Sequence, residues 1–184
     1  GIIPNVYVLP VIALNDSTNL TENESLRFHL LNNTLASAWD NLTNFSHPLN
    51  FIFVATPYKL PNFYKNRSPM IFGNSLWNNL YPTLNLTYPA IVIILDAKDN
   101  LNASPNNVKR YPGTDYNIIS EIYIPGLSNR SNVTSLYKYD DEIFLNIILH
   151  ELAHTFIAYP PPTEQRQFHS NHPASFTNLT GFST

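Results

Sequence analysis

The chain has 184 residues, of which 43% are hydrophobic and 13% aromatic, so it is long enough to bury a core as one domain and too apolar for a disordered chain. Its formal net charge is −3 and its 10 basic residues form no run, which argues against nucleic acid as a partner. Its apolar runs are far shorter than the roughly 20 residues that cross a bilayer, so we expect no membrane span.

The first part of the sequence predicts a strand, a helix and a second strand. Asn5–Leu14 is β-branched and apolar, and Pro10 within it favours an edge position or a bulge. Apolar residues recur at helical spacing over Ser25–Leu42, which predicts a helix with one buried face. Leu49–Ala55 predicts the second strand, and Thr56–Pro69, with three prolines, a loop.

The middle of the sequence predicts a buried strand between loops. Ile71–Leu80 is consistent with a short helix. Ala90–Leu95 is continuously apolar, which is typical of a central strand covered on both faces. Asp96–Thr114 is polar and predicts a long loop, whereas Ile118–Ile124 predicts another strand. That last strand is a candidate edge strand that could bind a substrate backbone by strand addition, and an ordinary sheet strand fits it equally well.

A second long helix is predicted near the end of the chain. Asp140 or Asp141 caps it, apolar residues continue to Leu152, and Pro160-Pro161-Pro162 forbids its extension. The order of strands and helices predicts an α/β fold with a mixed sheet and two main helices. We expect a single domain over residues 1–184.

This second helix carries the motif His150-Glu151-Leu152-Ala153-His154. Residues four apart share one face of a helix, so both imidazoles can reach one ion with Glu151 beside it. Two histidines bind zinc in this pattern, and the glutamate serves as general base. The composition predicts only about 0.006 such matches by chance. The motif therefore predicts a catalytic zinc site.

A catalytic zinc ion normally has three protein ligands and one open position. The residues after the prolines offer Glu164, His169 and His172 as the third ligand. The residue types alone leave these three alternatives open.

Residues 143–177 resemble the zinc-binding region of matrixin-type metzincins. His169-Ser170-Asn171-His172-Pro173 and the residues after it are similar to the family's segment around the third ligand, and Ser120–Ile124 resembles the strand before its zinc helix. The resemblance implies that His150, His154 and His169 are zinc ligands and Glu151 the general base. It also implies a zincin-like fold in which residues 1–156 form an upper subdomain and 157–184 a short C-terminal lower subdomain.

The sequence departs from the family pattern HExxHxxGxxH at three points. Ile157 and Pro160 replace the pattern's glycine and third histidine, and Thr177 lies where the family has a turn methionine. We interpret the displaced histidine as an insertion of nine residues within Ile157–Phe168, which is mild thermodynamically because loop-closure entropy grows slowly with length.

Asparagine is abundant, and its arrangement indicates N-glycosylation. Of 25 Asn residues, 12 begin an N-x-S/T sequon, about three times the number expected from composition. The sites are Asn15, Asn19, Asn23, Asn32, Asn41, Asn44, Asn66, Asn85, Asn102, Asn129, Asn132 and Asn178. The chain begins at Gly1 without a leader, so we expect a mature secreted or cell-surface protein. The chain has no cysteine, and N-glycosylation without any disulfide is more typical of an archaeal exoprotein than of a small animal or fungal one.

Two functions fit these features. The first is a secreted zinc-dependent endopeptidase that hydrolyses protein or peptide substrates, with Zn²⁺ as cofactor and Glu151 as general base. The alternative is a non-catalytic glycoprotein associated with a cell surface or envelope that retains a metalloprotease fold. The intact Glu151 favours the first, because a purely structural zinc has no use for that carboxylate.

Overall fold

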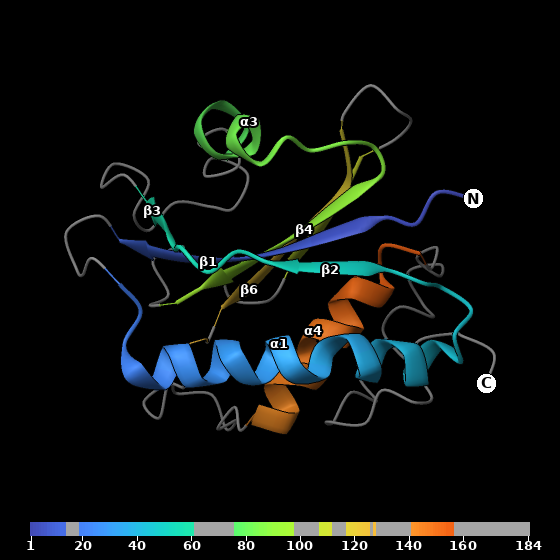
Figure 1. Ribbon diagram of the computed structural model, residues 1–184, viewed down its shortest axis with the longest axis horizontal. Coiled ribbons are helices and arrows are strands. Elements are labelled where there is room, and N and C mark those ends of the chain that lie inside the picture. The colour runs from blue at the N-terminus through green and yellow to red at the C-terminus, as the bar shows by residue number, and fades with distance from the viewer. Residues whose placement is uncertain are drawn as a thin grey trace, which may run out of the picture.

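The computed structural model describes residues 1–13, 19–60, 76–97, 107–111, 117–125, 127 and 141–156. These residues form a mixed α/β fold in which a mostly parallel sheet carries the two long helices on one face and a short helix on the other (Figure 1). The elements are β1 (Asn5–Ala13), α1 (Glu22–Thr43), β2 (Asn50–Phe53), β3 (Tyr58–Leu60), η2 (Leu76–Leu80, a π-helical turn), α3 (Tyr81–Leu84), β4 (Ala90–Asp96), β5 (Asn107–Arg110), β6 (Ile118–Pro125) and α4 (Asp141–Ala153).

The strand order is β2-β1-β4-β6-β5, with β3 pairing the far end of β1. All pairs are parallel except β5–β6, which is antiparallel. Every residue of β4 is buried, because neighbouring strands flank it and helices cover both faces. The predicted central strand at Ala90–Leu95 is therefore confirmed. None of the helices in the described part of the chain has the length and apolar character to cross a membrane.

Strand β1 is internal, so the edge position, one of the two alternatives expected from Pro10, is wrong. On one side β1 pairs with β4 along most of its length, and on the other it pairs first with β2 and then with β3. The β2 pairing ends at Val8 and the β3 pairing begins at Val11, which leaves Pro10 opposite a gap. On the side of β2 and β3, the Val8 carbonyl accepts a hydrogen bond from the Val54 N–H. The backbone nitrogen of Pro10 points to the same side, because residues two apart in a strand have the same orientation. The missing N–H therefore costs no ladder hydrogen bond.

Three further expectations about strands are wrong. Of the two alternatives for Ile118–Ile124, the edge strand is wrong and the ordinary sheet strand is confirmed, because β6 lies between β4 and β5. The outer strand is β5, which lies inside the segment expected to be a loop. Its four residues, Asn-Val-Lys-Arg, are too short and polar for periodicity to reveal. The three-residue strand β3 likewise lies within the predicted loop Thr56–Pro69.

The sheet separates two hydrophobic layers, because successive strand residues point to opposite faces. On the α1 and α4 side, Val8, Ile93 and Ile122 pack against helix residues that include Trp39 and Phe144. On the other side, the alternate residues of the same strands pack against η2 and α3. The long helices and the short helical segment therefore belong to different layers (Figure 1).

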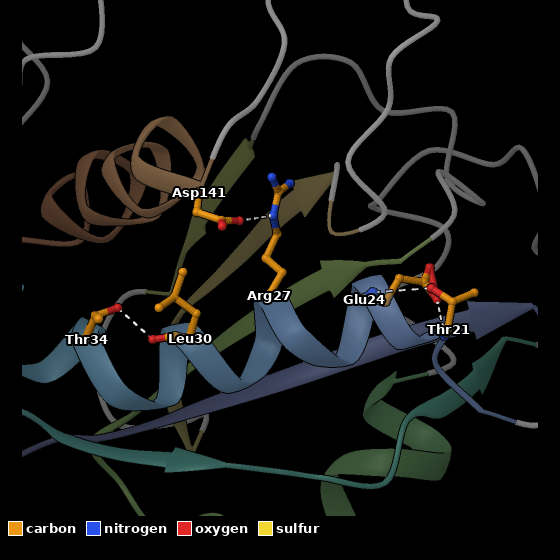
Figure 2. A network of polar contacts seen from close by, with 6 residues as sticks. All are labelled: Thr21, Glu24, Arg27, Leu30, Thr34 and Asp141. Carbon is orange, nitrogen blue, oxygen red and sulfur yellow. Dashed lines mark hydrogen bonds and ion pairs between the residues drawn. The ribbon is translucent and has the colours of Figure 1, made fainter.

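Helix α1 begins earlier than its apolar pattern predicts, because a capping box sets its start. The Thr21 hydroxyl accepts from the Glu24 backbone N–H at 3.2 Å, and the Glu24 carboxylate accepts from the Thr21 N–H at 2.8 Å (Figure 2). This reciprocal pair satisfies two backbone donors that a helix start would leave open. Of the short helix expected over Ile71–Leu80, the described part is Leu76–Leu80, and α3 continues from it with Pro82 in its first turn, where proline is tolerated.

Candidate metal centre

The N-terminal end of α4 is attached to α1 by a charged pair. Arg27 on α1 donates from Nε to Asp141 Oδ1 at 2.9 Å (Figure 2). Its guanidinium lies 4.8 Å from the centre of the Phe144 ring. The Arg27 side chain is only 4% exposed. Asp141 is the first residue of α4, where a carboxylate also interacts favourably with the helix dipole. These contacts hold the start of the motif helix beside α1.

The C-terminal end of α4 is held by polar and aromatic contacts. The Thr155 hydroxyl lies 2.8 Å from the hydroxyl of Ser120, a fully buried residue on β6. The Phe156 ring lies 5.8 Å from the Trp39 ring on α1 and 5.4 Å from the imidazole of His47. The two residues that follow the motif are thus in contact both with the sheet and with α1, which limits how far the helix end can move.

His150 and His154 lie together at this anchored end. The expected spacing holds although α4 ends at Ala153, because the His154 N–H still reaches the His150 carbonyl, at 3.3 Å. The two side chains meet through their Nε2 atoms at 2.9 Å, and the rings are nearly perpendicular. Both residues are buried, at 6% and 4% exposure. Two imidazole nitrogens therefore converge on one point at the edge of the core.

Glu151 lies beside this pair and is more accessible than either histidine. Its Oε1 is 4.0 Å from His150 Nε2, and its side chain is 13% exposed. Among the described residues, His150, Glu151 and His154 form a group whose candidate ligand atoms all lie within 4.8 Å of one another. The carboxylate can therefore reach a water molecule placed near the two nitrogens.

The candidates for the third ligand, Glu164, His169 and His172, lie outside the described residues, as does the whole segment 157–184. The two other described histidines do not join the group. His29 is exposed on α1. His47 has its Nδ1 2.8 Å from the Ser46 hydroxyl, and its carbonyl accepts from Trp39 Nε1.

The opposite face of the sheet buries a carboxylate that no sequence motif singles out. Glu121 on β6 is 1% exposed and accepts hydrogen bonds from the hydroxyls of Tyr81, Tyr111 and Tyr123. Trp77 Nε1 in turn donates to the Tyr111 oxygen at 3.3 Å. Alternation along β6 predicts that Glu121 and Tyr123 share a face, but the other two tyrosines reach it only through the tertiary fold.

Burial and the Glu121 charge raise the pKa of the Tyr81 and Tyr123 hydroxyls well above the ordinary phenol value. Burial is the larger cause at both residues, because it penalises the phenolate. The hydroxyls therefore stay protonated into the alkaline range and act as donors to the carboxylate.

The described sequons carry exposed asparagines. The six are Asn19, Asn23, Asn32, Asn41, Asn44 and Asn85. The other six, which are Asn15, Asn66, Asn102, Asn129, Asn132 and Asn178, lie outside the described residues. The six described side chains are therefore accessible from solvent, as glycosylation requires.

The chain matches no known protein family model, and neither the curated proteins nor the solved structures contain a match to it.

Proposed function

We propose that this protein is a secreted zinc-dependent endopeptidase whose active site is built on the end of α4. The observation that carries the proposal is the convergence of His150 Nε2 and His154 Nε2, 2.9 Å apart, with the Glu151 carboxylate beside them. Two buried imidazoles and an accessible carboxylate in this arrangement are typical of the HExxH sites of zinc peptidases.

The donor set fits zinc. Zinc binds neutral imidazole at about 2.0–2.1 Å, so two such nitrogens on one tetrahedral ion lie roughly 3.3 Å apart. The observed separation of 2.9 Å needs only a few tenths of an ångström of adjustment at the side chains. Two nitrogens and one nearby carboxylate suit zinc better than calcium or magnesium, which prefer oxygen ligands.

The roles of the residues follow from their positions. When bound, Zn²⁺ would polarise the substrate carbonyl and lower the pKa of a water molecule toward about 7. His150 and His154 would hold the ion through their Nε2 atoms, because neutral imidazole is the form that binds metal. Glu151 would accept the proton of the attacking water and pass it to the leaving amine.

Hydrolysis of casein tests this function. We expect the purified full-length protein to cleave casein, to lose that activity on treatment with a chelator, and to regain it when Zn²⁺ is restored. A protein that binds zinc tightly but shows no hydrolysis in any of these states would instead support the non-catalytic glycoprotein.

The third ligand is tested by three single variants, His169→Ala, His172→Ala and Glu164→Ala. We propose His169, so His169→Ala should reduce zinc affinity sharply whereas the other two should retain it. Loss of zinc in the His172 or Glu164 variant alone would reject the matrixin-like assignment while leaving the role of Glu151 intact.

Secretion and glycosylation form part of the same proposal. The excess of sequons and the exposure of the described ones support N-linked glycans and an extracellular or cell-surface location. Native material should be heavier than the 21.0 kDa polypeptide. A native mass equal to that of the bare chain would reject the glycans.

A further inference from the structure

The sequon Asn41-Leu42-Thr43 lies in the last turn of α1, and its two defining side chains have opposite surroundings. The Asn41 side chain is exposed. Thr43 has an exposed fraction of 0%, and its hydroxyl donates to the Trp39 carbonyl at 2.9 Å. Side chains two positions apart on an α-helix are rotated by about 200° about the helix axis, so they lie on nearly opposite faces. The folded protein therefore shows the acceptor amide of this sequon while it hides the hydroxyl.

The sequon Asn85-Leu86-Thr87 is a natural control. It follows the end of α3, where Asn85 is the C-cap residue with a left-handed backbone, φ 50°. Both Asn85 and Thr87 are exposed. The two groups that define this sequon are accessible from solvent without any unfolding.

A transferring enzyme that acts only on N-x-S/T must read both the asparagine and the hydroxyl two residues later. From the opposed surroundings of Asn41 and Thr43 we propose that Asn41 receives its glycan before α1 folds, whereas Asn85 is an acceptor in the folded protein as well. The inference rests on the proposed glycosylation and adds the order of events.

The transfer is a substitution at the sugar. A bond forms between the Asn41 amide nitrogen and the anomeric carbon of an oligosaccharide activated on a lipid phosphate. The bond from that carbon to the phosphate oxygen breaks, the lipid phosphate leaves as an anion, and the amide loses one proton. Because the Asn41 side chain is exposed, the finished glycan is compatible with the folded helix.

Unwinding the end of α1 would expose Thr43 but is opposed by several contacts. Asn44 closes the helix in a left-handed conformation, and its N–H reaches the Asn41 carbonyl at 3.4 Å. The Phe45 N–H donates to the Asp40 carbonyl at 2.9 Å. Trp39, which is fully buried, donates from Nε1 to the His47 carbonyl in the loop beyond. Exposing Thr43 would break this capped end, so we expect Asn41 to react slowly in the folded state.

The test uses folded full-length protein made in a host without N-glycosylation. It is incubated with membranes that contain an oligosaccharyltransferase and its lipid-linked donor, beside two short unfolded peptides that span each sequon. Glycopeptide mass spectrometry should find both peptides modified at similar rates. In the folded protein, modification at Asn41 should be at least tenfold slower than at Asn85. Asn41→Gln and Asn85→Gln variants assign each signal to its site.

Three outcomes are distinguishable. Modification of Asn41 in the folded protein as fast as Asn85 would overturn the proposed order. Native protein that carries a glycan at Asn85 but none at Asn41 would also overturn it, while leaving the glycoprotein assignment standing. Native protein without glycans at any site would overturn the glycosylation itself.

Discussion

The two faces of the sheet each place a glutamate beside a small group of polar side chains, and the two glutamates are suited to opposite tasks. On the α4 side, Glu151 is 13% exposed and lies 4.0 Å from a buried histidine. On the α3 side, Glu121 is 1% exposed and accepts from three phenol hydroxyls. The first can reach solvent water next to the two nitrogens of the proposed metal site, whereas the second is enclosed by its donors.

The comparison shows that burial alone does not identify a functional carboxylate. Glu121 is the more deeply buried, but its oxygens already accept from three phenol hydroxyls and its side chain is almost closed to solvent. Its role is to connect β6, the residue after β5 and α3 through one acceptor. Glu151 is less buried than Glu121, but it is the better candidate for a functional carboxylate because its neighbours are His150 and His154.

The largest expected contrast is in catalysis. Glu151→Gln should lower kcat by about 10²–10⁴-fold, because the amide cannot accept the proton of the attacking water. Glu121→Gln, assayed where it remains folded, should keep kcat within a few-fold of the wild type. Equal losses of kcat in the two variants would contradict the assignment of a catalytic role to Glu151 and a structural role to Glu121.

The second contrast is in stability and has the opposite direction. Glu121→Ala leaves three hydroxyls without their shared acceptor, and we expect a loss of about 3 kcal/mol in the free energy of unfolding. Urea unfolding measures it. Glu142→Ala, at an exposed position of α4, is the matched control and should cost under about 1 kcal/mol. Glu121→Ala and Glu142→Ala losing the same amount would show that the tyrosine cluster contributes little.

A third prediction concerns alkaline pH. The pKa values of Tyr81 and Tyr123 are raised in the folded protein, so their contribution to stability is complete below the phenol pKa of the unfolded chain, about 10. Above that pH the unfolded chain releases these protons first, and stability falls by about 1.4 kcal/mol per pH unit for each phenol. Urea unfolding between pH 8 and 11 measures the slope. It should flatten in the Tyr81→Phe/Tyr123→Phe double variant, and an unchanged slope would contradict the assignment.

The smallest expected effect is at the start of α4. Asp141→Asn removes the charge that pairs with Arg27, but the Asp141 side chain is 56% exposed and solvent screens the interaction. We expect a loss of up to about 1 kcal/mol in the free energy of unfolding and no change in zinc content. Loss of zinc in this variant would mean that the pair positions the metal site rather than only the helix.

The sequence predicted those features that depend on local periodicity. The buried strand at Ala90–Leu95 and the long helices follow from apolar residues that repeat at the spacing of each element. The pairing of His150 with His154 follows from helical geometry, since residues four apart share a face. These predictions need no knowledge of how distant segments meet.

Features that depend on contacts between distant segments could not be predicted from the sequence. Strand β5 is recognisable only from its antiparallel partner β6, because four polar residues carry no periodic signal. The tyrosines around Glu121 come from α3, from the residue after β5 and from β6, and no spacing rule links Tyr81 to Tyr123. The position of Pro10 likewise depends on where β2 gives way to β3.

The zinc content of purified protein tests the site on α4 most directly. We expect close to one zinc per chain in the wild type, and little or none in His150→Ala and in His154→Ala. The control His29→Ala, at an exposed histidine on α1, should retain the metal. Zinc content that is unchanged in both motif variants would contradict the proposed metal site.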